Sequence, residues 1–293
     1  LSPASLQRLS EAFDPPAGVR LGAVSQSGYC SSCGTKLEAV PLTSAQYSEM
    51  SSALLSAARR AGSAQYEDLL HFGEWVKGRH YTYIVDGANV AYCNQNFEGG
   101  GFSFEQIELA CRWLREMSDG EPPLIVLPSE YLSEDTIPNH TCRGRHGPSV
   151  IQPHQWELIQ HWRHSQNLWV SEPGSSDDWY WMYAAILAGP GARVLTNDEM
   201  RDHSFGMLRS AYFERWKARH CMHFSFSHGA QPDRAEPTLE IQEPQPFSVE
   251  IQCCGRRWHL PSAPNGAQWL CVELPALARD EPIEPSKKCS KVA

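Results

Sequence analysis

The sequence predicts an α/β fold, an open parallel sheet with helices on both faces, followed by a small β unit. From Tyr81 onward, short apolar runs of strand length alternate with longer segments of helical periodicity, which favours a parallel sheet. Acidic side chains follow three of these runs, as expected where ligands bind at the carboxyl ends of parallel strands. A stretch rich in Pro and Glu, residues 229–246, is predicted to be a linker, and the tail from Phe247 alternates like a small β unit.

The individual elements follow from local patterns along the chain. Residues 1–40 contain Pro15-Pro16 and several glycines, and they are predicted to be loop-like. Residues 44–77 carry apolar side chains at helical spacing, with a break expected near Gly62. The remaining elements are strands at Tyr81–Val85, Leu124–Leu127, Leu168–Val170, Arg193–Thr196 and Met222–Phe226, helices at Phe104–Met117, His154–Arg163, Asp177–Leu187 and Ala211–Arg219, and an irregular segment at 129–150.

The composition limits the class of protein. The 293 residues leave room for about two domains of ~150 residues, and 41% of them are hydrophobic, which is enough for buried cores. The net charge of −9 has the wrong sign for binding nucleic acid over the whole surface, so a polyanion must meet local basic patches or a part outside this chain. No apolar run approaches the ~20 residues that cross a membrane. The chain begins with Leu1 and not Met, so we expect a fragment or a processed form.

Four aspartates follow predicted strands. Asp86 ends the first apolar run, Asp177 and Asp178 come after the third, and Asp198 comes after the fourth. Because the carboxyl ends of parallel strands share one edge, these side chains are expected at one rim of the sheet. Carboxylates suit hard divalent cations, and a pair of such cations ~3.5–4 Å apart serves phosphodiester hydrolysis. We therefore predict catalytic aspartates that bind Mg²⁺ or Mn²⁺, with two cations per site.

Each of these aspartates also has an ordinary structural explanation. Asp177 and Asp178 would lie in the first turn of a helix, where acidic side chains favour the helix dipole. Asp86 and Asp198 stand beside Gly or Asn, which are typical of turns. For any one position the structural explanation is sufficient. The coincidence of all of them at successive strand ends favours the metal site.

The cysteines indicate a second metal site. Cys30 and Cys33 form a CxxC pair, which is half of a tetrahedral zinc site. A redox pair has the same spacing, but no strand–helix setting of the thioredoxin kind surrounds this one. The distribution of the ten cysteines favours reduced thiols in an intracellular protein over a secreted disulfide framework. They are Cys30, Cys33, Cys93, Cys111, Cys142, Cys221, Cys253, Cys254, Cys271 and Cys289.

The other half of the zinc site must come from the far end of the chain. Its candidates are His259 and Cys271, or alternatively Cys253 and Cys254. We favour His259 and Cys271 because each lies in a compact aromatic segment, Trp258-His259 and Trp269-Leu270-Cys271. One structural Zn²⁺ would then join the two chain ends into a small domain, with all four ligand positions filled by protein.

The order of motifs resembles the protein-only RNase P family. The motifs are a CxxC pair, VDGANV, SSDDW, LTNDEMRDH, WHLP and WLCV, and together they extend from about Tyr29 to about Val272. The resemblance implies a metallonuclease domain of the NYN/PIN-like type and a central zinc-binding domain. Members of the family also carry a pentatricopeptide RNA-binding domain, and no such repeats precede Cys30. The domains implied here are 1–44 with 244–293 for zinc binding, and 45–243 for the NYN-type nuclease.

The resemblance also implies an activity and roles for residues. The family removes the 5′ leader of precursor tRNA by metal-dependent hydrolysis and leaves a 5′-phosphate on the tRNA. In this sequence the metal-site aspartates correspond to Asp86, Asp177, Asp178 and Asp198, and the zinc ligands to Cys30, Cys33, His259 and Cys271. Asp202 and His203 fall within the same motif as Asp198, and we expect them to support catalysis at most.

The expected partner is precursor tRNA, with no membrane and no required protein partner. Phosphate contacts position RNA without specifying its sequence, and basic side chains make them. The candidates, each of which is also explained as part of a solvated face, are Arg143, Arg145, Arg201, Arg209, Arg215, Lys217 and Arg219. Two alternatives remain open at this point. One is a nuclease of the same type that cuts other structured RNA, and the other is a subunit that is inactive without partner proteins.

Overall fold

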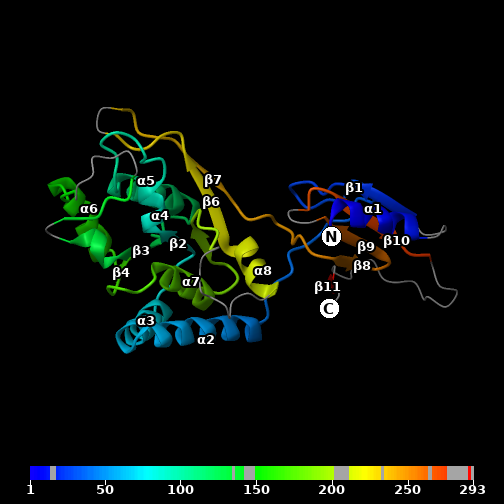
Figure 1. The fold of residues 1–293 in the computed structure, drawn as a ribbon, viewed down its shortest axis with the longest axis horizontal. Helices are drawn as coiled ribbons and strands as arrows, with labels where there is room; N and C mark the ends of the chain where they lie inside the picture. Colours follow the sequence, from blue (N-terminus) through cyan, green and yellow to red (C-terminus); the bar gives the residue numbers. More distant parts are fainter. Residues whose placement is uncertain are drawn as a thin grey trace. The chain divides into compact units, whose positions relative to one another are not determined.

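The computed structural model describes residues 1–13, 18–133, 136–141, 149–200, 211–231, 234–262, 266–275 and 290–291. The chain divides into two compact units. Residues 1–41 and 245–293 form one of them, called here the terminal unit, and residues 42–244 form the other, called the α/β unit. Each unit contains its own sheet (Figure 1).

The α/β unit is built on a six-stranded sheet in the order β4-β3-β2-β5-β6-β7. The first five strands in this order are parallel, and β7 runs antiparallel to β6. This confirms the predicted α/β class with a parallel sheet. The strands are β2 (Tyr83–Asp86), β3 (Leu124–Pro128), β4 (Leu168–Ser171), β5 (Arg193–Leu195), β6 (Cys221–Phe226) and β7 (Leu239–Gln242).

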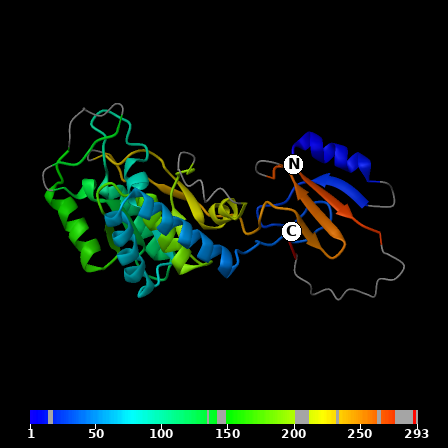
Figure 2. The same ribbon diagram turned by 60° about the horizontal axis from the view of Figure 1, so that its bottom comes forward.

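Helices cover both faces of this sheet (Figures 1 and 2). Successive side chains of a strand point to opposite faces, and neighbours on β2 accordingly join different cores, Ile84 one and Val85 the other. The core around Ile84 contains α2 (Ser44–Ala61), α3 (Ser63–Lys77), α7 (Asp177–Ala188) and α8 (Ala211–His220). The core around Val85 contains α4 (Gly87–Tyr92), α5 (Phe104–Met117), the short 3₁₀ turn Ser129–Leu132 and α6 (Pro153–His164). None of the described helices is long and apolar enough to span a membrane.

The terminal unit is an antiparallel sheet in the order β1-β10-β9-β8-β11, covered by α1 (Pro3–Ala12). Leu6 of α1 is fully buried against Leu270 and Val272. The two ends of the chain therefore build one sheet, because strand β1 pairs with β10, some 250 residues later in the sequence. The strands are β1 (Gly18–Gly22), β8 (Gln252–Cys254), β9 (Arg257–Pro261), β10 (Trp269–Glu273) and β11 (Ser290–Lys291).

Two segments differ from the sequence prediction. Residues 1–40 were expected to be loop-like, but they contain α1 and β1. A β-strand such as β1 is stabilised by its partner, here β10, so its local composition carries little signal. Residues 229–246 were expected to be a linker, but they contain β7, which alternates half-buried and exposed side chains along the edge of β6. Leu239 and Ile241 pack on the core around Val85, which stabilises a strand too short to be recognised alone.

One buried histidine joins α8, α2 and the turn before β5 in the α/β unit. His220, at the end of α8, donates from Nδ1 to the carbonyl oxygen of Ala192 at 2.8 Å, while its Nε2 lies 3.0 Å from the hydroxyl of Tyr47 on α2. Its ring stacks on Trp216 and is 1% exposed. Burial lowers the pKa of His220 from 6.5 to about 4, so the imidazole is neutral in the folded protein.

The contribution of His220 to the stability of the α/β unit is therefore expected to be lost as the pH falls from about 6.5 to 4. In that window the unfolded chain binds a proton at His220 and the folded protein does not, which costs up to about 3 kcal/mol of unfolding free energy. Urea unfolding of the wild type and H220Q at pH 7.5 and pH 5 measures this, and the variant should lose less stability between the two. The exposed His161 provides a matched control, H161Q. An equal pH dependence of H220Q and the wild type would contradict the assignment.

Candidate functional site

A cavity of about 500 Å³ opens at the carboxyl edge of the sheet in the α/β unit. All four aspartates predicted from strand ends line it, together with side chains from α4 and from the segment after β5. Acidic groups that are as much as 112 residues apart in sequence thus share one cavity, as the parallel topology requires. The lining residues are Asp86, Ala88, Asn89, Tyr92, Cys93, Asp177, Asp178, Asn197 and Asp198.

Asp86 is fixed at the point where β2 passes into α4. Its backbone ends the strand, and its Oδ1 accepts from the backbone N–H of Asn89 at 3.2 Å, so it caps α4. The following Gly87 allows α4 to lie close to β3, since a Cβ at this position would be 2.8 Å from the carbonyl oxygen of Val126. Asp86 Oδ2 accepts from the hydroxyl of Thr196 at 2.7 Å. Both oxygens are held, and the side chain is 4% exposed.

Asp177 and Asp178 begin α7, where the N-terminal dipole favours negative charge. Asp178 is buried, and its Oδ2 accepts from the hydroxyl of Ser176 at 3.2 Å. The turn before the helix is tied to α3, because Asp68 accepts from the hydroxyl of Tyr180 at 2.6 Å and also from the backbone N–H of Glu172. The sequence therefore places two adjacent carboxylates at the start of α7. Hydrogen bonds to Asp68 of α3 hold that start in place.

Asp198 lies in the turn after β5. Its backbone N–H donates to the hydroxyl of Thr196 at 3.0 Å, and its Oδ1 accepts from the backbone N–H of Met200 at 2.7 Å. The neighbouring Asn197 forms two side-chain bonds to the backbone of Phe224, and its own N–H donates to Oδ1 of Asn89. This network joins the turn after β5 to α4 and to β6.

The cavity concentrates negative charge. Burial, followed by the charges of Asp177 and Asp178, raises the pKa of Asp86 well above its ordinary value. Burial and the charge of Asp178 raise the pKa of Asp177 to about 7. Carboxylates gathered in this way repel one another, and a divalent cation with oxygen ligands would neutralise them. The donor set therefore fits a hard cation such as Mg²⁺ or Mn²⁺.

Three of the predicted basic residues, Arg215, Lys217 and Arg219, lie in the described part of the chain and do not line this cavity. Arg215 is 6% exposed, which argues against direct contact of its guanidinium with RNA phosphates. Lys217 pairs with Glu214 at 3.0 Å, and Arg219 is half-buried on the same helix. The remaining predicted residues lie outside the described part of the chain, and they are Arg143, Arg145, Arg201, Asp202, His203 and Arg209.

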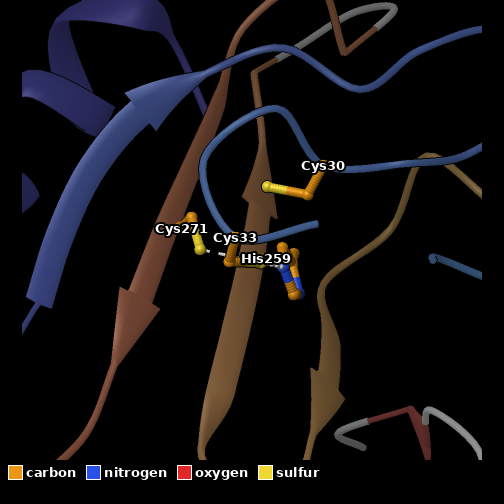
Figure 3. Close-up of side chains that lie close together, drawn as sticks. All are labelled: Cys30, Cys33, His259 and Cys271. Carbon is orange, nitrogen blue, oxygen red and sulfur yellow. Dashed lines mark hydrogen bonds between the residues drawn. The ribbon is translucent and has the colours of Figure 1, made fainter. Parts of the chain in front are cut away.

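The terminal unit contains a compact group of three thiols and one imidazole (Figure 3). Cys30 and Cys33 lie on the loop after β1, and His259 and Cys271 face each other in register on β9 and β10. The ligand atoms of all four residues lie within 4.8 Å of one another. His259 Nε2 is 3.2 Å from Cys33 Sγ and 3.8 Å from Cys271 Sγ. Ligands of a tetrahedral zinc site are separated by about 3.8 Å when the Zn–S bond is about 2.3 Å.

The protonation of His259 and Cys33 also suits zinc, whereas burial and the neighbouring cysteines raise the pKa of the Cys271 thiol. Burial and the charge of Arg257 lower the pKa of His259 to about 4, so its imidazole is neutral at pH 7 and can bind a metal. Burial raises the pKa of the Cys33 thiol, but hydrogen bonds with Thr35 and the two neighbouring cysteines outweigh it and lower that pKa overall. The alternative pair, Cys253 and Cys254, is not part of the group, and Cys253 donates to the carbonyl oxygen of Gly255. The group of Cys30, Cys33, His259 and Cys271 can hold a zinc ion.

Comparison with known proteins decides the family. The sequence profile of Protein-only RNase P matches residues 24–275, which is most of the chain. The chain belongs to the protein-only RNase P family. This confirms the resemblance of the motif series and the α/β nuclease-like fold that it implied.

Relatives in the protein-only RNase P family come from plants and animals. The chain is 33% identical over 267 residues to Proteinaceous RNase P 3 and 34% identical to Proteinaceous RNase P 2, both from Arabidopsis thaliana. Each match covers 87% of this chain, but 42% and 46% of the relatives. The mitochondrial ribonuclease P catalytic subunit of Rattus norvegicus is 22% identical. The crystal structure of nuclear proteinaceous RNase P 2 from A. thaliana matches with a TM-score of 0.68 and 31% identity, over 87% of this chain and 49% of that one. The chain thus spans about half the length of these relatives.

Proposed function

We propose that this chain contains the nuclease of a protein-only RNase P and hydrolyses the phosphodiester bond that joins the 5′ leader to precursor tRNA. The observation that carries this proposal is the arrangement of Asp86, Asp177, Asp178 and Asp198 around one cavity in a member of this family. The relatives are named as RNase P enzymes, or as the catalytic subunit of one, which supports the substrate class. We propose precursor tRNA as the substrate and no required protein partner for the chemical step.

The four aspartates would hold two Mg²⁺ or Mn²⁺ ions. Such cations supply a water of lowered pKa for attack on phosphorus and neutralise the leaving 3′-oxygen. The chain's own residues position these ligands. Asp86 is fixed through both of its oxygens, while Asp177 and Asp178 are presented by the anchored start of α7. The charges of the aspartates would also prevent RNA from approaching this edge without a cation, which makes cleavage strictly dependent on the metal.

We further propose that the two units correspond to two domains of the family. The α/β unit would be the metallonuclease domain, and the terminal unit would be the zinc-binding domain with one structural Zn²⁺ on Cys30, Cys33, His259 and Cys271. Support comes from the closed donor set, in which four protein ligands leave no open position for catalysis. The zinc would therefore contribute to folding and not to chemistry.

Cleavage of a 5′-labelled precursor tRNA by the purified chain with Mg²⁺ tests the function. We expect one cut at the mature 5′ end, a 5′-phosphate on the tRNA product, and no product after addition of EDTA. An unrelated RNA hairpin of similar length is the matched control, and it should be cut at least about tenfold more slowly. Equal cleavage of both RNAs would favour a general nuclease for structured RNA. If a folded, zinc-loaded chain does not cut either RNA, the proposed function of this chain alone is wrong.

A further inference from the structure

Thr196 connects two of the four aspartates through its hydroxyl group. It follows β5 directly, and its side chain is fully buried. The hydroxyl donates to Oδ2 of Asp86 at 2.7 Å and accepts from the backbone N–H of Asp198 at 3.0 Å. The backbone N–H of Thr196 donates to the carbonyl oxygen of Met222 on β6, which fixes the threonine to the sheet. The hydroxyl does not itself line the cavity.

We propose that Thr196 is a positioning residue of the cation site, which holds Asp86 and Asp198 in the orientation that binds a divalent cation. This inference rests on the proposed function, because it assigns a role within the same carboxylate site. The bond to Oδ2 and the bond from Asn89 to Oδ1 together prevent rotation of the Asp86 carboxylate. The hydrogen bond from the backbone N–H of Asp198 fixes the start of the turn that carries the Asp198 carboxylate.

The chemistry of threonine explains why this position requires a hydroxyl group. A hydroxyl can donate one hydrogen bond and accept others at the same time. The Thr196 hydroxyl donates to the Asp86 carboxylate at the end of β2, and it accepts from the backbone N–H of Asp198 after β5. A side chain of the same shape without oxygen would leave a buried carboxylate oxygen and a backbone N–H without these partners. Groups that orient metal ligands in this way contribute about 10–100-fold to metal affinity in proteins.

The test is calorimetric titration of the zinc-loaded protein with Mn²⁺ alone, without RNA. T196V removes the hydroxyl at constant shape and is expected to weaken Mn²⁺ binding by about 10–100-fold. T196S retains the hydroxyl and is expected to bind within about threefold of the wild type. The matched control is T82V, the same change at an exposed threonine beside the opposite, amino end of β2. It should bind Mn²⁺ like the wild type.

Three results would overturn the inference. These are wild-type affinity in folded T196V, equal weakening in T196V and T196S, and no binding of Mn²⁺ to the wild type. If T196V does not fold, T196A is compared with T196S. At least tenfold weaker binding in the alanine variant would then support the role, and equal affinities would overturn it. Because the titration contains no RNA, a wild-type protein that binds Mn²⁺ but leaves precursor tRNA intact counts against the proposed function alone.

Discussion

Replacing Asp177 with Asn is expected to abolish metal-dependent cleavage and, at the same time, to stabilise the metal-free protein. Loss of a cation ligand removes several kcal/mol of transition-state stabilisation, so the rate should fall by at least about 100-fold. The gain in stability follows from the raised pKa. Asp177 has a pKa of about 7 in the folded protein and an ordinary value of 3.8, so its ionised form is destabilising when the protein is folded. The partly exposed amide should therefore add on the order of 1 kcal/mol at pH 7.5.

The raised pKa of Asp177 also predicts how the stability of the protein depends on pH. The destabilising contribution of Asp177 disappears as the pH falls from about 7 towards 4, because the folded protein takes up a proton at Asp177 before the unfolded chain does. D177N should lack this pH dependence. Thermal unfolding without divalent cations at pH 8 and pH 5.5 measures it. Added Mg²⁺ should raise the melting temperature of the wild type more than that of D177N.

The control for this pair of effects is D119N, which makes the same substitution at an exposed position in the turn before β3. It should change neither cleavage nor the response to Mg²⁺. Cleavage by D177N at the wild-type rate would show that Asp177 is not a ligand of the cation site. A D177N protein that is less stable than the wild type at pH 8 would contradict the charge argument, even if cleavage is lost.

Replacing Cys271 with Ser is expected to remove the zinc and to unfold the terminal unit, while the α/β unit retains its fold. Structural zinc sites contribute about 10 kcal/mol or more of apparent folding free energy, and a small sheet with little core depends on it. Among the residues that the structure describes, the buried apolar side chains of the terminal unit form two small groups, with Leu6, Leu270 and Val272 in one and Leu37, Phe247 and Trp269 in the other. Elemental analysis should give one zinc per wild-type chain and none for C271S.

The matched control is C253S, which removes a half-buried thiol outside the ligand group. It should retain one zinc per chain and the wild-type unfolding curve. Proteolysis followed by mass spectrometry locates the damage, and new cuts in C271S should fall in the terminal unit. Loss of zinc from C253S together with its retention in C271S would favour the alternative ligand pair.

The sequence alone was sufficient for the features that depend on local pattern. The helix over Phe104–Met117 was predicted with the bounds that the structure has, because its apolar side chains recur at helical spacing. The acidic residues were placed at one edge because parallel topology leaves little choice about where strand ends lie. The proposed zinc ligands Cys30 and Cys33 were indicated by their spacing, and His259 and Cys271 were indicated by short aromatic motifs.

The features that were missed depend on partners distant in the sequence. Strand β1 is stabilised by antiparallel pairing with β10, and β7 is stabilised by antiparallel pairing with β6. Helix α4 is six residues long and begins at a glycine, so its propensity is poor, and its cap is the carboxylate of Asp86. Thr196 looked like the last residue of a strand. Only the three-dimensional arrangement shows that its hydroxyl lies between two carboxylate segments.

The spacing of the proposed zinc ligands has a consequence for the order of events during synthesis. Cys33 and His259 are separated by 226 residues, and the whole α/β unit lies between them. A growing polypeptide exposes its first two thiols long before the imidazole and the third thiol have been made, so metal loading must come late. Domains usually fold as units during translation. We therefore expect the α/β unit to become compact on the ribosome first. Its folding replaces a long flexible loop, and closure of such a loop would oppose assembly of the four side chains.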